Sequence, residues 1–336
     1  MSHRLRDTSG RSSAKLQAVL QAVRGKIVSG EFLPGTRLPT RSELRDELGV
    51  CGATVQRAFD ALRRDGFIEA KGSAGTYVAD RPPHLSRYAL VFRDYPLRHG
   101  PDGTFTSVLA HEAMRMAQRG EADIQIFSGI DGHSDVPDYG RLMRDAASHR
   151  LAGAMFVFGV HVGPGGPVHA DGFPHVSIGS AHDEPPVLTP DTRSFVDRAV
   201  RHLVSQGRTR IAVIGGAHGS EPDRHLLDAV DQAGATMPPH WYLPVHARMP
   251  SAARHPVHLL MAERPDGLIV FDDAFVESVV FGVMDAGARV GEDVDIVAHR
   301  NFPWTGGSGA PVRRLGFCAA EILRMALASI NALRAG

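Results

Sequence analysis

Apolar residues recur at helical spacing in three short segments near the start of the chain. In the first segment, residues 14–29, the apolar positions form one stripe, which predicts a helix that packs along one face. The stripe comprises Leu16, Val19, Leu20, Val23 and Ile27. The stretch GEFLPGTRLP follows, and its two prolines and two glycines predict a rigid, irregular connection.

The second and third segments predict two helices separated by a tight turn. Thr40 stands three residues before Glu43, which is the spacing of a capping box, and Gly49 is placed to end that helix after about two turns. The third helix has apolar residues at positions i, i+3, i+4 and i+7, namely Val55, Ala58, Phe59 and Leu62. Two helices joined in this way are typical of a helix-turn-helix.

The outer face of the third helix supplies candidate DNA contacts. Small residues at its start, Gly52 and Ala53, let the helix N-terminus approach the major groove closely. There Thr54, Gln56 and Arg57 would reach phosphates or base edges.

A β-hairpin is predicted after the third helix. The stretch IEAKGSAGTYVAD contains two short β-favouring runs around a Gly-rich turn, which predicts the wing of a winged helix. Lys71 beside Gly72 is placed for a phosphate or the minor groove. These residues by themselves leave open a winged-helix module that binds protein, or nothing, instead of DNA.

From residue 87 onward, β-favouring runs alternate with helical patterns. Strands are predicted at 87–92, 122–127, 153–160, 174–179, 210–216, 241–246, 267–271 and 294–299. Helices are predicted at 105–119, 139–149, 191–206, 223–233, 251–263, 277–286 and 315–333. This alternation predicts an α/β fold of two lobes, each a doubly wound parallel sheet, with a ligand site in the cleft between them.

Composition adds an uneven distribution of charge. Residues 1–83 hold 14 Lys and Arg against 9 Asp and Glu, whereas the remaining residues hold 23 against 28. A basic head on a mildly acidic body favours nucleic acid as a partner.

Other chemistry is weakly indicated. The chain has no apolar run of transmembrane length and no signal-peptide core at its start, so we expect a cytoplasmic protein without a membrane partner. Cys51 and Cys318 lie far apart, and His255 and His258 have no further ligand nearby in the sequence, so we expect no metal and no cofactor. A nucleophile, a general base and an orienting group do not occur together, which argues against an enzyme.

The stretch GEFLPGTRLPTRSELRDELGVCGATVQRAFDALRRDGFIEAKGSAGTYV resembles the winged helix-turn-helix of GntR-family transcription regulators. The resemblance covers roughly residues 14–79 and rests on the family's pattern of Pro-Gly-x-x-Leu-Pro, Gly-Val-Ser, Thr-Val, Ala-x-x-x-Leu and Gly-Thr-x-Val. It implies that the head binds double-stranded operator DNA.

The departures from that pattern lie on the DNA-facing side. Arginines that contact DNA in well-known members correspond to Ser42, which follows Arg41 in this chain, and to Gly52 and Gln56, while a wing histidine corresponds to a position near Lys71. The resemblance therefore implies an operator unlike the commonest ones of the family, because a glutamine pairs with adenine where an arginine favours guanine. The helix cap also departs: the family often has Ser or Thr in place of the cysteine before Gly52, and thiols cap helices poorly.

Two stretches of the second half carry a further resemblance: DTRSFVDRAVRHLVSQGRTRIAVIGG and RPDGLIVFDDAFVESVVFGVMDAGARVGEDVDIVAH. Through them the chain from about residue 86 to 333 resembles the effector domain of LacI-type regulators and sugar-binding proteins, which have the type I periplasmic-binding-protein fold. Asp272 and Asp273 stand where that family has an Asn-Asp pair near the effector. Arg300 and Asn301 stand where it usually has Asp-Asp. Arg300 implies either an anionic group on the effector or an internal ion pair with Asp272, and we favour the internal pair.

Further effector contacts are expected from the same resemblance. Arg224 is a candidate for the arginine that clamps the effector, although aligning Gly234 with the family's glycine puts Pro222 at that place. Tyr95, Phe105 and Phe158 are candidate stacking surfaces for a sugar or base, with burial in the core as the commoner role of such aromatics.

We therefore expect a ligand-responsive transcription regulator, a repressor, with a winged helix-turn-helix at residues 12–79, a Pro-rich linker at 80–87 and a LacI-like effector domain at 88–336. A small metabolite, expected to be a carbohydrate, would control operator affinity. Two half-sites of operator DNA require a homodimer. A constitutive DNA-binding regulator whose sensor domain has lost its ligand is the alternative.

Overall fold

The computed structural model describes residues 5–98, 104–131, 136–160, 168, 172–179, 186–215, 222–245, 250–307 and 309–335, with side chains from residue 13 onward. Its contacts divide the chain into two compact units. One comprises Met1–Asp94, Met116–Val176 and Leu327–Gly336, and the other comprises Tyr95–Arg115 and Ser177–Ala326. Across these described residues, no helix combines the length and the hydropathy needed to span a membrane.

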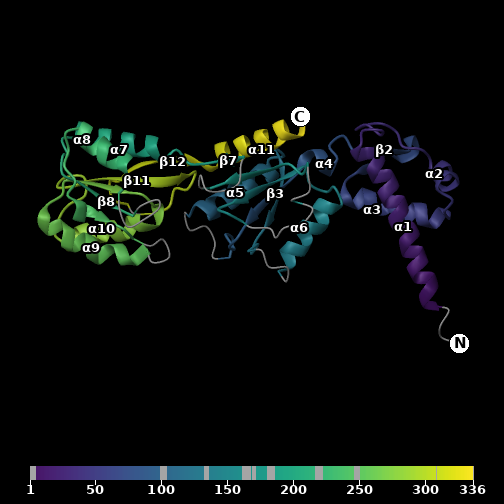
Figure 1. The fold of residues 1–336 in the computed structure, drawn as a ribbon, viewed down its shortest axis with the longest axis horizontal. Coiled ribbons are helices and arrows are strands. Elements are labelled where there is room, and N and C mark those ends of the chain that lie inside the picture. Colours follow the sequence, from purple (N-terminus) through teal and green to yellow (C-terminus); the bar gives the residue numbers. More distant parts are fainter. Residues whose placement is uncertain are drawn as a thin grey trace. The chain divides into compact units, whose positions relative to one another are not determined.

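Three helices and a two-stranded wing form the head (Figure 1). The elements are α1 (Leu5–Val28), α2 (Arg41–Leu48), α3 (Gly52–Asp65), β1 (Ile68–Ala70), η1 (Gly72–Ala74) and β2 (Thr76–Val78). The predicted stripes of α1 and α3 meet in one core, where Val23, Val55, Leu62 and Phe67 are buried. The predicted helices and antiparallel hairpin are confirmed, except that the first helix begins well before residue 14.

The predicted linker contains a helical turn, α4 (Pro83–Ser86), and ends where β3 (Arg87–Phe92) begins. Pro82 and Pro83 are buried, and the ring of His84 stacks on Phe67 with centroids 5.9 Å apart and planes 10° apart. The connection is therefore packed against the head rather than acting as a free spacer. The domain boundaries at residues 79 and 88 stay predictions.

The first sheet has the strand order β4-β3-β5-β6-β7. Its other strands are β4 (Asp123–Phe127), β5 (Gly153–Val157), β6 (His175–Ile178) and β7 (Val187–Leu188), and the helices between them are α5 (Phe105–Gln118) and α6 (Pro137–Ala147). Leu142 and Ala146 of α6 pack against Ala89 and Val91 of β3 and Phe156 of β5, so α6 covers one face of this sheet.

The second sheet has the order β12-β11-β10-β8-β9, and its strand pairs are parallel. Its strands are β8 (Ile211–Ile214), β9 (Tyr242–Leu243), β10 (Gly267–Val270), β11 (Asp295–Phe302) and β12 (Arg313–Cys318). Its helical elements are α7 (Thr192–Ser205), α8 (Arg224–Gln232), η3 (Pro239–Trp241), η4 (Pro250–Ala253), α9 (Arg254–Leu260), η5 (Met261–Glu263), η6 (Asp273–Phe275) and α10 (Val276–Asp285). The last helix, α11 (Ala319–Ala335), follows β12 and ends in the first unit, where Asn331 accepts a hydrogen bond from the hydroxyl of Tyr88 in β3 at 2.8 Å.

Alternate residues of each central strand of this second sheet face opposite helical layers (Figure 1). Leu268 and Val270 of β10 pack in one core with α9 and α10. Ile269, between them, packs in the other core with α7 and α8. This alternation is what a strand buried on both faces requires. The predicted α/β architecture of parallel sheets is confirmed.

Three predicted elements are wrong in detail. The last helix begins at Ala319 rather than Leu315, because residues 313–318 form β12 beside β11. Gly316 permits that pairing, since a Cβ on it would lie 1.8 Å from the carbonyl oxygen of Arg300. The helix predicted at 251–263 is divided into η4, α9 and η5. Of the strand predicted at 241–246, the described residues 241–245 form only the two-residue strand β9, since Pro244 has no N–H to donate, and residue 246 lies outside the described residues.

Candidate DNA interface and effector site

Helix α2 begins and ends as its sequence predicts. The backbone N–H of Glu43 donates to Thr40 Oγ1 at 3.3 Å, and the Glu43 carboxylate accepts from the backbone N–H of Thr40 at 2.7 Å. The backbone N–H of Thr40 has the largest effect in lowering the pKa of Glu43, and the side chain of Thr40 lowers it further. Gly49 ends the helix in the left-handed conformation, with φ of 61°. The turn that orients α3 is therefore fixed by local hydrogen bonds.

The N-terminus of α3 is open to solvent. Cys51, Gly52 and Ala53 are exposed, and the side chain of Cys51 makes no capping hydrogen bond to the helix. Its Sγ instead lies 3.1 Å from Thr54 Oγ1, an interaction that lowers the pKa of the thiol. Thr54 is only 6% exposed, so its predicted place on the outer face of the helix is wrong. Thr54 supports the start of the helix from inside because its hydroxyl points to Cys51.

Two polar residues of α3 differ in their availability. Gln56 is half-buried and its Nε2 donates to Asp60 Oδ1 at 3.0 Å. Arg57 is exposed, and among the described residues no acidic side chain lies within ion-pair distance of it. Arg57 can therefore contact a phosphate directly. Gln56 must first give up its hydrogen bond to Asp60 before it can bond to a base edge.

The remaining predicted DNA contacts lie on α2 and in the wing. Arg41 and Ser42 are exposed at the start of α2. Lys71 Nζ lies 2.8 Å from Glu69 Oε1 and 4.9 Å from the ring centroid of Tyr77, and the Glu69 pair raises the pKa of Lys71. Gly72 is exposed with φ of 58°. These positions are compatible with DNA contact, and their role stays a prediction.

In the second unit, a buried charged cluster lies at the carboxyl ends of β10 and β11. The Asp272 carboxylate caps η6 by accepting from the N–H of Ala274 at 3.0 Å. Asp273 lies beside it and is 5% exposed at its side chain. Burial raises the pKa of both carboxyl groups.

Two arginines flank Asp273. Arg314 Nη1 lies 2.9 Å from Asp273 Oδ1, while Arg300 Nε lies 3.9 Å from Oδ2. The other end of Arg300 donates from Nη2 to the carbonyl oxygen of Gly306 at 2.8 Å. The internal pair expected for Arg300 therefore forms with Asp273 rather than Asp272, and Arg314 is the closer partner. Asn301, 4% exposed, completes the cluster, since its backbone N–H also bonds Asp273.

Arg314 is the functional candidate that sequence reasoning missed. The stretch RRLGFC directly precedes the apolar pattern of α11, so the end of a short strand was assigned to the start of that helix. The signal that would have found it is Gly316, a residue of low helix propensity at the expected helix start. Burial lowers the pKa of Arg314, in opposition to the attraction of Asp273.

The other effector candidates do not join this cluster within the described part of the second unit. Arg224 is exposed at the first position of α8 and makes no described hydrogen bond or ion pair with Asp273. Tyr95 is 51% exposed, with the Arg98 guanidinium 6.0 Å from its ring, and Phe105 is half-buried at the start of α5. Phe158 belongs to the first unit, where it follows β5 with φ of 50° and is 48% exposed. The exposure of Tyr95 and Phe158 differs from that of core aromatics.

The two histidines of α9 stack on one another and, among the described residues, do not form part of a metal site. The rings of His255 and His258 lie 6.4 Å apart with an interplanar angle of 16°. In the part of the chain that the structure describes, no group of three or more His, Cys, Asp or Glu side chains is arranged to hold a metal ion.

Two family models match separate parts of the chain. The model "Bacterial regulatory proteins, gntR family" matches residues 15–78, and the model "Periplasmic binding protein-like domain" matches residues 200–332. The first match covers the head, and the second covers most of the second sheet with α11. The chain thus contains a GntR-type helix-turn-helix domain and a periplasmic-binding-protein-like domain.

Known relatives are transcription regulators. An arabinose metabolism transcriptional repressor of Halalkalibacterium halodurans is 21% identical over 303 residues, which cover 85% of this chain and 80% of that protein. The mannosyl-D-glycerate transport/metabolism system repressor MngR of Escherichia coli is 31% identical over 96 residues, 29% of this chain and 40% of that protein. A solved complex of the transcriptional regulator CelR with cellobiose has the same fold, with a TM-score of 0.54 at 16% identity, over 88% of this chain and 94% of that one.

Proposed function

We propose that this chain, which joins a GntR-type helix-turn-helix domain to a periplasmic-binding-protein-like domain, is a repressor whose operator affinity is controlled by a small carbohydrate. The observation that carries the proposal is the exposed N-terminus of α3, held by the capped helix α2 and followed by a wing. This arrangement lets Arg57 reach phosphates and Gln56 reach base edges in a major groove.

A carbohydrate effector is supported by the names of relatives. One is an arabinose metabolism repressor, and the solved CelR structure contains cellobiose. The parallel sheet of the second unit places Asp272, Asp273 and Asn301 at its carboxyl edge, where ligands of doubly wound folds bind. Carboxylate and amide groups at such an edge are suited to the hydroxyl groups of a sugar.

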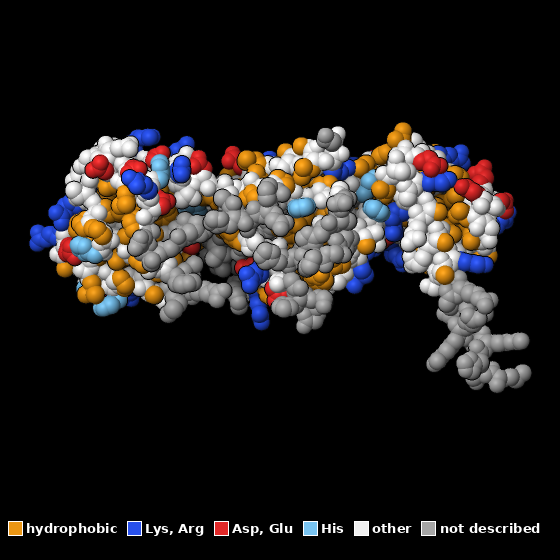
Figure 2. Space-filling model, viewed as in Figure 1, with side chains coloured by type: hydrophobic (Ala, Val, Ile, Leu, Met, Phe, Trp, Pro, Cys, Tyr) orange, Lys and Arg blue, Asp and Glu red, His pale blue; other side chains and the backbone are white. Residues whose placement is uncertain are grey.

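A homodimer follows from the mode of DNA binding. One head reads one half-site, so a palindromic operator needs a second copy related by two-fold symmetry. Hydrophobic side chains gather on the surface over α9 and α10 (Figure 2), where Leu259, Phe281 and Met284 are exposed, and we expect this face to form the contact between the two copies. Beside Met284 a hollow of about 690 Å³ is lined by α10 and by residues near Pro311. We expect sedimentation to show a dimer and Met284→Glu to weaken it, with Met114→Glu as the matched exposed control.

The experiment that tests the function has two stages. The first is in-vitro selection of duplex DNA from a random pool at physiological salt, because phosphate contacts alone weaken steeply as salt rises. A palindromic motif is the expected result, and no enrichment would overturn the DNA-binding proposal. The second stage titrates the selected duplex complex with L-arabinose, cellobiose and a panel of other sugars and sugar acids.

The second stage also separates the two candidate functions. Release of DNA by one compound supports the ligand-controlled repressor. Unchanged affinity across the panel, together with calorimetry that detects no binding, would support the constitutive regulator instead. The Arg314–Asp273 pair favours that second candidate because it already occupies Asp273 Oδ1, one of the two carboxylate oxygens that a ligand would otherwise contact. The other oxygen, Oδ2, is buried without a hydrogen-bond partner in the described residues.

A further inference from the structure

Asp65 occupies an unfavourable place for a carboxylate. It is the last residue of α3, directly before Gly66, which ends the helix with φ of 89°. The carboxyl end of a helix carries partial negative charge, so an acidic side chain there is repelled. A residue that breaks this local rule in the recognition helix needs a compensating interaction.

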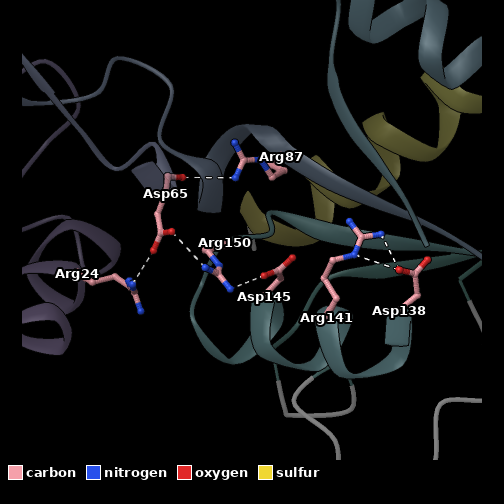
Figure 3. Close-up of polar contacts among 7 residues, drawn as sticks. All are labelled: Arg24, Asp65, Arg87, Asp138, Arg141, Asp145 and Arg150. Atoms are coloured by element: carbon pink, nitrogen blue, oxygen red, sulfur yellow. Dashed lines mark hydrogen bonds and ion pairs between the residues drawn. The ribbon is translucent and has the colours of Figure 1, made fainter. Parts of the chain in front are cut away.

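Three arginines from separate parts of the chain contact Asp65, and two of them compensate the charge of its carboxylate (Figure 3). Arg24 of α1 pairs with Asp65 Oδ2 at 3.1 Å, and Arg150, in the turn after α6, pairs with Oδ1 at 3.2 Å. Arg87, at the start of β3, donates to the backbone carbonyl oxygen of Asp65 at 3.4 Å. The end of α3 is therefore bound both to the head and to the first sheet and its helix.

Arg150 ties this contact to α6. Its second nitrogen pairs with Asp145, near the end of α6, at 2.5 Å, and its backbone N–H donates to the Asp145 carbonyl oxygen at 2.8 Å. The side chains of Asp145 and Arg150 are 14% and 27% exposed. Partial burial reduces screening by salt, so these pairs hold their geometry better than surface pairs.

The other end of α6 lies at the carboxyl edge of the first sheet (Figure 3). Asp138 accepts from the backbone N–H of Ser128, which directly follows β4, at 2.9 Å. Arg141 Nη2 donates to the carbonyl oxygen of Ile126 at 2.7 Å. Ligands of this fold bind at that edge of the sheet. Helix α6 therefore connects the ligand-binding edge with the end of α3.

We propose that Asp65 and Arg150 are positioning residues that couple the orientation of α3 to the first lobe through α6. A shift of α6 at the sheet edge moves Arg150 and, through Asp65, rotates α3 as a rigid element. The proposal rests on the proposed DNA-binding function. The test therefore measures the coupling between the two residues.

The test uses the full chain and the duplex enriched by selection, with hydrogen–deuterium exchange as the readout. In the wild type, DNA binding protects amides of α3 and also those of the turn at 148–152. In the variants Arg150→Met and Asp65→Asn, DNA still protects the amides of α3 from exchange. The factor by which DNA slows amide exchange at residues 148–152 is, however, at least about threefold smaller than in the wild type. The double variant loses no more of the DNA-induced protection at residues 148–152 than either single variant, since both substitutions remove the same interaction.

The matched control is Arg289→Met, which removes an arginine paired with Asp293 inside the second unit. It leaves the protection at 148–152 unchanged. DNA-induced protection of that turn in Arg150→Met equal to the wild type would overturn the coupling proposal. Failure of the wild type to enrich any duplex, or to protect α3, would instead overturn the proposed function and is seen before any variant is made.

Discussion

The Arg314 guanidinium lies 2.9 Å from the Asp273 carboxylate, and the two side chains are 12% and 5% exposed. Removing Arg314 leaves the buried Asp273 carboxylate with only the more distant Arg300 guanidinium, 3.9 Å away, as its charged partner. Arg314→Met is therefore expected to lower the free energy of unfolding of the second unit by about 3 kcal/mol, as measured by urea titration.

Arg313 provides the control for this prediction because it precedes Arg314 in β12 but is exposed. Arg313→Met should change stability by less than about 0.5 kcal/mol. Equal losses in the two variants would show that the cost comes from strand composition and not from the Asp273 pair.

The head was predictable because its signals are local. The Thr40–Glu43 capping box, the Gly49 stop and the apolar spacing of α3 each act within a few residues, and each appears in the structure. The charged cluster of the second unit was only half predictable. Asp273 and Arg300 were named from a resemblance, but which groups pair depends on the register of β11 against β12, a long-range feature that no local pattern carries.

The same limit applies to the end of α3. The sequence does not distinguish Asp65 from other polar residues on the surface of a helix, and its partner Arg150 is 85 residues away. Their pairing depends on how the head packs against α4 and β3, which the sequence suggested only as a Pro-rich linker. Local residue types set the elements, whereas the tertiary packing sets the ion pairs between them.

The cap of α3 gives a second prediction. Cys51 makes no side-chain capping bond, and a serine oxygen at that place would accept from an amide of the first turn. Cys51→Ser should raise the free energy of unfolding of the head by about 0.5 kcal/mol, measured by thermal unfolding. Cys51→Ala is the control and should give no gain. A serine variant no more stable than the alanine variant would show that the Thr54 contact already substitutes for a cap.

Gln56 and Arg57 should affect DNA binding in different ways. Gln56→Ala should reduce discrimination at one base pair by at least about 1 kcal/mol, because a glutamine amide reads a base edge. Arg57→Ala should weaken binding to every sequence and reduce the slope of log affinity against log salt by about 1. Binding of both variants to a panel of duplexes at several salt concentrations checks this. The opposite assignment would mean that α3 lies in the groove with another face toward the bases.

His84 predicts a pH dependence of stability. Burial, with smaller contributions from Arg334 and His149, lowers the pKa of His84 to about 4, well below its ordinary value of 6.5. The folded state therefore binds fewer protons than the unfolded state between these values. The contribution of His84 to stability is fully present above pH 6.5 and is lost as the pH falls toward 4.

The variant His84→Phe isolates this contribution because phenylalanine keeps a ring against Phe67 but cannot be protonated. Between about pH 7 and about pH 5 the wild type should lose about 1 kcal/mol more than the variant, a value reduced for the partial exposure of the ring. His299, whose pKa burial also lowers to about 4, contributes equally to both proteins and cancels in the comparison. Parallel pH profiles of the two proteins, measured by urea unfolding, would show that the His84 ring is hydrated and that the connection between head and sheet opens readily.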